Sequence, residues 1–248
     1  MIDKFLRFPA GNTLAVIVLI ALIITWLTSL VLSLRNVPVR TDKGWYTGIL
    51  PVFALLGIPA TLDLLQTDGI TFIFAAVAFV VFALNIFVPV LRMSGKSSHP
   101  LVADWSKWAI PISVIGGLVV SGYLTFIETT GTQVLCGPSG GCGDVQSSKY
   151  AILFGVLPVG LLGFLGNIGI LAGWAVWQFG PAAIKKLSAL SIWGMCIFGV
   201  LFSTYLTFLE PFVIGATCMW CISSAVLMIV LLLVSTPAAQ QALAIADD

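Results

Sequence analysis

The stretch CMWCISSAVLMIVLLLV, residues 218–234, places two cysteines directly before a long apolar run. Cys218 and Cys221 are three residues apart, so their side chains share one face at the start of the predicted helix. The unpaired N–H groups and the positive end of the helix dipole favour a thiolate at the first of them. Such a pair can alternate between a dithiol and a disulfide, although two cysteines can also pack as small apolar side chains.

The composition around this stretch is that of a membrane protein. Hydrophobic residues make up 59% of the chain and charged residues 8%, with a mean hydropathy of +1.11, which excludes a soluble globular domain. The net charge of +1 gives no support for binding nucleic acid. Several apolar segments have about the 20 residues that a bilayer-spanning helix needs. They cover residues 13–34, 46–66, 70–92, 107–128, 151–178, 189–210 and 217–235.

A polar linker at residues 92–107 divides these segments into two groups. We therefore expect an all-α integral membrane protein, in which a four-helix transmembrane bundle follows an N-terminal unit of about three transmembrane helices. The N-terminal unit covers residues 1–100, and the sequence indicates no role for it; the four-helix domain covers residues 101–248. His99, the single histidine, is expected to lie in solvent within this linker.

A second cysteine pair lies in the polar connection ETTGTQVLCGPSGGCGDVQSSKY, residues 128–150. Cys136 and Cys142 are separated by a glycine-rich segment, whose backbone can adopt unusual dihedrals and so bring the two sulfurs together or move them apart. A mobile pair of this kind can relay electrons by thiol–disulfide exchange. Two alternatives remain open, static disulfides and a zinc site of four thiolates. No metal is expected, because the loop offers a zinc ion no obvious supporting hydrogen bonds.

The positively charged residues predict the orientation of the chain. Because the side richer in Lys and Arg is cytoplasmic, both cysteine pairs are expected on the extracytoplasmic side of the cell inner (plasma) membrane, where oxidised cysteines persist. The richer side carries Arg35, Arg40, Lys43, Arg92, Lys96, Lys107, Lys185 and Lys186, and the other side carries Lys4, Arg7 and Lys149.

An internal repeat supports this layout. The segment GLVVSGYLTFIE, residues 117–128, matches GVLFSTYLTFLE, residues 199–210, and the same offset carries Cys136 onto Cys218. The joint match of the apolar motif, the terminal Glu and the cysteine indicates a duplication. We expect the two repeated helices to be parallel and to deliver their cysteine-bearing connections to the same face.

Electrons that reach Cys218 and Cys221 need an acceptor. The sequence has no haem-attachment motif and no dinucleotide fingerprint, which leaves a lipid-soluble quinone, menaquinone or ubiquinone, entering near Cys221. Cys196 stands alone in the middle of a predicted span and is expected to pack as an apolar side chain. The residues expected to wall the quinone pocket, unless they serve ordinary helix packing, are Trp220, Phe154, Leu157 and Phe164.

The last four predicted helices resemble the vitamin K epoxide reductase family. The resemblance rests on the loop pair Cys136 and Cys142, the following Ser147-Ser148-Lys149-Tyr150, and the pair Cys218 and Cys221 at the start of the last helix. It covers residues 107–235. It implies a four-helix bundle around a quinone, and it implies that Ser148 helps to position the loop and its disulfide.

The resemblance also implies a role for each cysteine. Cys221 would react with the quinone, Cys218 would exchange with Cys142, and Cys136 would exchange with an external thioredoxin-like protein. Animal members carry a Tyr where Ala225 stands here, whereas bacterial members are similar to this chain in lacking it, and they oxidise periplasmic thiol oxidases while reducing quinone. Because the tail after the last span is short, we expect the thioredoxin-like partner in trans.

These observations predict a quinone-dependent membrane thiol-disulfide oxidoreductase that supports disulfide-bond formation. Its electrons would pass from an extracytoplasmic thioredoxin-like partner through Cys136 and Cys142 to Cys218 and Cys221, and then to the quinone. The alternative is a non-enzymatic polytopic membrane protein, a transporter or a scaffold, whose cysteines form structural disulfides or hold zinc.

Overall fold

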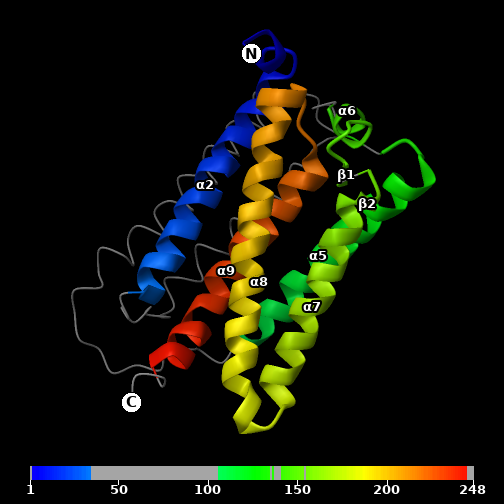
Figure 1. Ribbon diagram of the computed structural model, residues 1–248. Helices are drawn as coiled ribbons and strands as arrows, with labels where there is room; N and C mark the ends of the chain where they lie inside the picture. Colours follow the sequence, from blue (N-terminus) through cyan, green and yellow to red (C-terminus); the bar gives the residue numbers. More distant parts are fainter. Residues whose placement is uncertain (1, 35–105, 135, 137–140, 154, 245–248) are drawn as a thin grey trace.

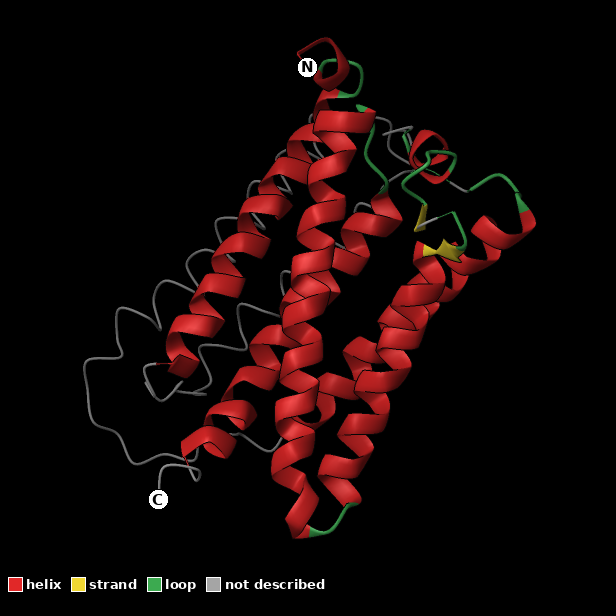
Figure 2. Cartoon of the chain, viewed as in Figure 1, coloured by secondary structure: helices red, strands yellow, loops and turns green. Residues whose placement is uncertain are grey.

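The structure is a computed structural model that describes residues 2–34, 106–134, 136, 141–153 and 155–244. Long helices make up most of it (Figures 1 and 2). The predicted spans at residues 46–66 and 70–92, and His99, lie outside the described residues.

The described helices confirm an all-α membrane fold. Five of them are long and apolar enough to cross a membrane. These are α2 (Pro9–Leu34), α5 (Ser106–Thr130), α7 (Val159–Phe179), α8 (Ala182–Leu209) and α9 (Met219–Ala244). The shorter elements are α1 (Ile2–Phe5), α6 (Cys142–Gln146), β1 (Ile152–Leu153), β2 (Leu157–Pro158) and the π-helix η1 (Glu210–Ile214).

Helix α9 is the centre of the bundle. It contacts α2, α5 and α8, while α7 packs between α5 and α8. Its side chains Ile222, Leu231 and Leu232 are almost completely buried, as expected for a helix that is apolar on all sides. The cysteine pair at the start of α9 is therefore attached to the most enclosed helix of the described bundle.

Helix α2 shares the core of the four-helix bundle. Its residues Leu14, Val18 and Leu22 belong to the same buried cluster as Ile222 and Leu231 of α9. At the opposite end from the cysteines, Ser29 of α2 is hydrogen-bonded to Thr236 at 2.7 Å. The first predicted span is thus joined to the redox bundle along its length.

The N-terminal end, α6 and the β1–β2 hairpin lie at the same end of the bundle (Figure 1). There Asn12, which has no exposed surface, connects three segments. Its Nδ2 donates to the carbonyl oxygens of Phe5 at 2.8 Å and Gly215 at 3.5 Å, and its Oδ1 accepts a hydrogen bond from Thr217 Oγ1 at 2.9 Å. This side chain therefore fixes the turn that precedes Cys218.

The predicted span at residues 151–178 is wrong at its start. The chain from Ile152 to Pro158 instead forms the antiparallel β1–β2 hairpin, with Ile152 opposite Pro158, and α7 begins only at Val159. The cause is local, because Gly155 takes a φ of 73° in the turn and Pro158 is extended at the N-cap. Apolar composition alone does not separate such a hairpin from a helix.

The predicted span at residues 189–210 is too short. Helix α8 already begins at Ala182, after Pro181, and continues from Leu209 into the π-helix η1. The carbonyl oxygen of Glu210 accepts hydrogen bonds from the N–H groups of Gly215 and Ala216. This wider turn brings the chain back toward α9 and ends beside the cysteine pair.

Replacing Asn12 by Ala is expected to lower the free energy of unfolding by about 1–3 kcal/mol, because it leaves buried partners without their hydrogen bonds. Thermal unfolding in detergent measures the change. Thr13→Ala is the matched control, since the exposed Thr13 hydroxyl donates to Pro9 O within its own helix, and it should cost less than about 0.5 kcal/mol. Equal losses in the two variants would contradict the assigned role of Asn12.

Candidate active site

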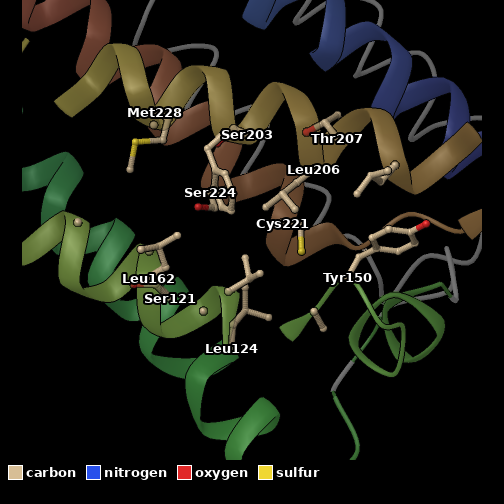
Figure 3. A pocket seen from close by; sticks show the side chains of 18 of the residues that line it. Ser121, Leu124, Tyr150, Leu162, Ser203, Leu206, Thr207, Cys221, Ser224 and Met228 are labelled. Atoms are coloured by element: carbon tan, nitrogen blue, oxygen red, sulfur yellow. The ribbon is translucent and has the colours of Figure 1, made fainter. Parts of the chain in front are cut away.

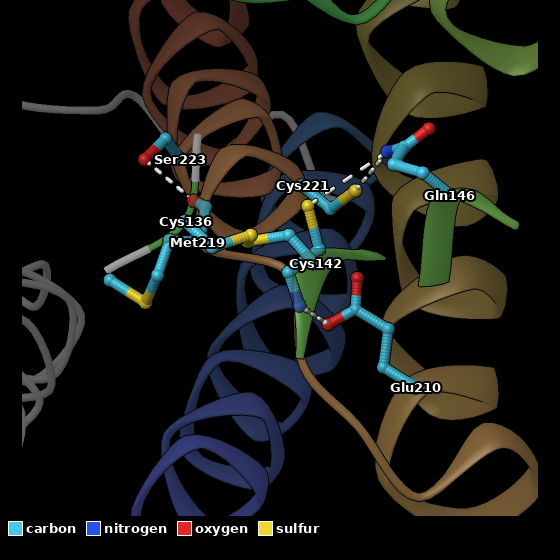
Figure 4. Close-up of a disulfide and its surroundings, with 8 residues drawn as sticks. Cys136, Cys142, Gln146, Glu210, Met219, Cys221 and Ser223 are labelled. Atoms are coloured by element: carbon cyan, nitrogen blue, oxygen red, sulfur yellow. Dashed lines mark hydrogen bonds between the residues drawn. A yellow bond between two sulfur atoms is a disulfide. The ribbon is translucent and has the colours of Figure 1, made fainter. Parts of the chain in front are cut away.

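The two cysteine pairs meet at one end of the bundle. Cys136 and Cys142 form a disulfide with their Cα atoms 5.9 Å apart, whereas Cys218 and Cys221 are free thiols. All four belong to one packed apolar cluster (Figure 4). Two connections far apart in sequence thus form a single site, with one pair oxidised and the other reduced.

The loop that carries Cys142 packs closely against the turn before α9, and we call this contact of Gly141 with Ala216 and Thr217 the Gly141 seat. Gly141 precedes α6 as its N-cap, and a Cβ added there would lie 2.7 Å from the backbone nitrogen of Thr217 and 2.9 Å from Ala216 Cβ. Only a residue without a side chain fits this contact. The loop therefore rests directly on the backbone beside Cys218, and Cys142 and Cys218 are both fully buried there.

Gln146, the last residue of α6, connects the loop to the second pair. Its Nε2 donates to Cys218 Sγ at 3.9 Å and to Cys221 Sγ at 3.8 Å (Figure 4). These distances are long even for sulfur acceptors, so each contact is weak. Together they direct a polar N–H toward both sulfurs from the helix that also carries Cys142.

The surroundings of Cys218 favour its thiolate form. Its pKa lies below the ordinary value of a cysteine thiol, chiefly because the Cys221 thiol donates a hydrogen bond to it, with backbone groups and Gln146 adding to the effect. Burial of Cys218 acts in the opposite direction. A thiolate at Cys218, packed against Cys142, has the chemical character that disulfide exchange requires.

Glu210 lies directly beneath this pair. Its Oε2 accepts the N–H of Cys218 at 3.3 Å (Figure 4), and only 1% of the residue is exposed. Sequence reasoning did not select Glu210 as a site residue. The available signal was its place at the end of the repeated segment, where it corresponds to Glu128.

A cavity of about 750 Å³ lies next to Cys221 between α5, α7, α8 and α9 (Figure 3). Its polar end contains Glu128, Tyr150 and Glu210. From there the cavity follows α8 as far as Ser191, a distance of about 28 Å at 1.5 Å per residue. Its walls are largely apolar and include Leu124, Leu162, Leu165, Ile170, Met195, Phe198, Phe202, Leu206 and Met228.

The cavity reaches the outside of the bundle between α7 and α8. Leu165 of α7 and Phe198 of α8 both line it, and they are 53% and 61% exposed on the surface of the bundle. A ligand can therefore enter from the side rather than only from the cysteine end.

The predicted quinone-binding residues lie elsewhere than the cavity wall, as far as they are described. Trp220 packs on Tyr123 with ring centroids 4.5 Å apart, Leu157 lies in β2, and Phe164 faces α5 near Gly122. Phe154 is outside the described residues. For Phe164 the reason is helix rotation, because Leu162, Leu165 and Gly166 present the opposite face of α7 to the cavity.

The remaining site predictions have clear places. Ser148 lines the cavity, its N–H donates to Val145 O, and its hydroxyl oxygen is buried without a hydrogen-bond partner among the described residues. Cys196 is fully buried in the main core. In the part of the chain that the structure describes, no group of three His, Cys, Asp or Glu side chains is arranged to hold a metal.

Comparison with known proteins finds both a family model and curated relatives that match the chain. The model of the Vitamin K epoxide reductase family matches residues 108–236. Among curated proteins, the thiol-disulfide oxidoreductase LTO1 of Arabidopsis thaliana is 32% identical over 114 residues, which is 43% of this chain. The chain covers only 30% of the length of that relative. No solved structure matches the chain.

The close packing at Gly141 can be tested by the rate at which Cys142 and Cys218 form a disulfide. In a Cys136→Ala, Cys221→Ala protein, mild oxidation should join Cys142 to Cys218, as read by mass spectrometry without reduction. Adding Gly141→Ala should slow this bond about tenfold, because overpacking costs about 1–3 kcal/mol. Gly143→Ala is the matched control, since a Cβ there meets no atom within 4 Å. Equal rates in the two variants would contradict the seat.

The lowered pKa of Cys218 predicts a pH dependence. In a protein with Cys136, Cys142 and Cys196 changed to Ala, only Cys218 and Cys221 remain as cysteines. The thiolate absorbance of this protein should begin to rise at a lower pH than that of an ordinary cysteine. Gln146→Leu should move this rise to higher pH, because it removes an N–H that stabilises the thiolate. Gln178→Leu, at the far end of α7, should leave it in place. An unchanged titration in Gln146→Leu would disprove the contribution of Gln146.

Proposed function

Because the chain belongs to the vitamin K epoxide reductase family, we propose that it is a membrane oxidoreductase that passes electrons from a thioredoxin-like partner through its two cysteine pairs to a quinone. The observation that carries the proposal is the junction of three features. The disulfide pair packs on Cys218, and Cys221 in turn borders a long apolar cavity.

The proposed exchange between the pairs balances without another reactant. A reduced partner attacks Cys136 and leaves Cys142 as a thiolate, and a second partner thiol then releases Cys136. If the second pair is already oxidised to a Cys218–Cys221 disulfide, the Cys142 thiolate attacks Cys218 Sγ and releases Cys221 as a thiolate. Attack of Cys136 on Cys142 restores the loop disulfide and leaves Cys218 reduced. Each cycle oxidises one partner dithiol.

The shape of the cavity supports a quinone as the electron acceptor. Its polar end holds Cys221, Glu128 and Glu210, where a polar head group would receive electrons, and its apolar extension along α8 would hold a lipid tail. The opening between α7 and α8 gives access from the hydrocarbon layer. Both menaquinone and ubiquinone combine such a head with such a tail.

The partner and the location follow from the loop. Cys136 is the less buried cysteine of the disulfide, so we propose that a thioredoxin-like thiol oxidase attacks there in trans. We place the cysteine end on the extracytoplasmic side of the plasma membrane. The distribution of Lys and Arg in the sequence supports this, because eight of them are predicted on the side opposite the cysteines and three on the cysteine side.

The proposed redox domain comprises residues 101–248, and the family match over residues 108–236 falls within it. The unit before it, residues 1–100, contributes at least α2 to the shared core. The contacts of Asn12 with Gly215 and Thr217 support a bracing role for this helix at the turn before Cys218.

Quinone reduction tests the proposal directly. Purified protein supplied with a reduced thioredoxin-like protein and a quinone should convert quinone to quinol, followed by absorbance. Cys221→Ala should lower the rate to that of a protein-free mixture, because it removes the sulfur that borders the cavity. Cys196→Ala, a substitution in the core, is the control and should retain turnover.

A second substrate separates the two pairs. Cys136→Ala should lose turnover with the thioredoxin-like protein but retain it with a small dithiol, which can reduce the second pair without the loop. Quinone reduction by Cys221→Ala at the parent rate would refute the proposed function.

A further inference from the structure

Glu210 occupies a position that protein stability disfavours. Among the described residues it is the one Asp, Glu, Lys or Arg that is buried, with 1% of its surface exposed. Oε2 accepts the Cys218 N–H, but Oε1 is buried and has no hydrogen-bond partner in the described part of the chain. A buried polar atom without a partner costs free energy, which indicates a role beyond holding the turn.

The carboxyl group lies between the sulfurs and the cavity. Glu210 lines the cavity together with Cys221, and it interacts electrostatically with both thiols of the pair. Figure 4 shows the Glu210 carboxyl group with one oxygen on its hydrogen bond, which is the bond from the Cys218 N–H, and the other oxygen pointing away from that bond. The acid is therefore within the same enclosed space as the reacting sulfur and the proposed quinone head.

The proposed reaction needs protons as well as electrons. When Cys218 and Cys221 become a disulfide, they lose two electrons and two protons, and the two carbonyl oxygens of a quinone gain the same number as it becomes a quinol. Most of the cavity wall is apolar, so a proton for the quinone has to come from one of the few titratable groups at the polar end, beside Cys221. A carboxylic acid that lies beside the cysteine sulfurs and also lines the cavity can act as the proton carrier.

We propose that Glu210 is a catalytic acid and base that carries protons from the cysteine pair to the quinone oxygen. Starting from the Cys218 thiolate and the Cys221 thiol, the carboxyl proton passes to one quinone oxygen at the polar end of the cavity, and the Cys221 thiol returns a proton to the carboxylate as the disulfide forms. The two electrons of the sulfurs pass to the quinone, which becomes a singly protonated quinol anion. The charge of the site is the same before and after this step. Water at the cysteine end, which took up the proton of Cys218 when that thiol ionised, supplies the second proton. This inference rests on the proposed quinone reduction.

Other titratable groups surround Glu210 but do not replace it. Glu128, on the opposite wall, uses its Oε2 to accept the N–H of Gly160 at 2.8 Å, and Lys4 donates to Val213 O at 2.8 Å on the outer side of η1. Asp144 of α6 is paired with Arg7 at 3.2 Å. The titratable groups that share the sulfur site or the cavity with Glu210 are Cys218, Cys221, Glu128 and Tyr150, while Lys4 and Asp144 lie on α1 and α6, the short helices that contact η1.

The isosteric change Glu210→Gln separates this role from a purely structural one. The amide oxygen of Gln still accepts the Cys218 N–H, so the turn keeps its hydrogen bond, but the side chain has no acidic proton. Quinol formation by the pre-reduced protein should fall about 100-fold. Formation of the Cys142–Cys218 bond, which needs no quinone, should proceed as in the parent protein.

Chemical rescue provides a second measurement. Glu210→Ala leaves space beside Cys221, and added acetate should restore part of the quinol formation in this variant but not in Glu210→Gln, where the amide fills the space. Quinol formation in Glu210→Gln at the parent rate would overturn the inference, and so would an equal loss in both quinol formation and cysteine exchange. A parent protein that reduces no quinone would overturn the proposed function together with this inference.

Discussion

The contact between two stretches of backbone, at Gly141 and at Thr217, is the constraint on which the site depends. Here the loop that carries one cysteine pair touches the turn that carries the other, with no room for a side chain between them. A disulfide can exchange only with a sulfur that reaches it, so this contact determines that Cys218 is the thiol placed near the loop disulfide. Asn12 holds the same turn from the other side, and the two supports together leave Cys218 little freedom.

Much of the fold was predictable because membrane spans have strong signals. The described long helices correspond to the predicted spans, and the family resemblance on the four cysteines agrees with the match over residues 108–236. The start of α7 was predicted wrongly because an apolar hairpin beside Pro158 has the same hydropathy as a span. The start of α8 was predicted wrongly for the opposite reason, because Lys185 and Lys186 lower the hydropathy of a segment after Pro181 that is nevertheless helical. Hydropathy gives the apolar length, whereas the local backbone geometry decides where a helix begins.

The sequence indicates which cysteines matter but not which residues line the cavity. The four cysteines that the sequence singles out lie together in the structure, whereas the cavity depends on how each helix is rotated about its axis. Phe164 therefore faces α5, while Leu162, nearby on α7, faces the cavity. Glu210 was missed because an acid in an apolar span carries no partner information in the sequence. Its correspondence to Glu128 in the repeat was the one available indication.

The two copies of the internal repeat end in the same structural feature. Each copy ends in an acid that accepts an N–H at the beginning of the next long helix, Glu128 at Gly160 of α7 and Glu210 at Cys218 just before α9. The two copies thus share one connection between a helix end and a helix start. Only the second copy combines this connection with a buried oxygen beside reactive sulfur.

The opening between α7 and α8 has a consequence for how the two substrates arrive. Leu165 and Phe198 mark an entrance on the flank of the bundle, whereas Cys136 belongs to the tip. If the proposed function holds, a quinone from the lipid and a soluble protein partner would reach the site at different places on its surface. Binding of one substrate would then not block the other, and both could be bound at the same time.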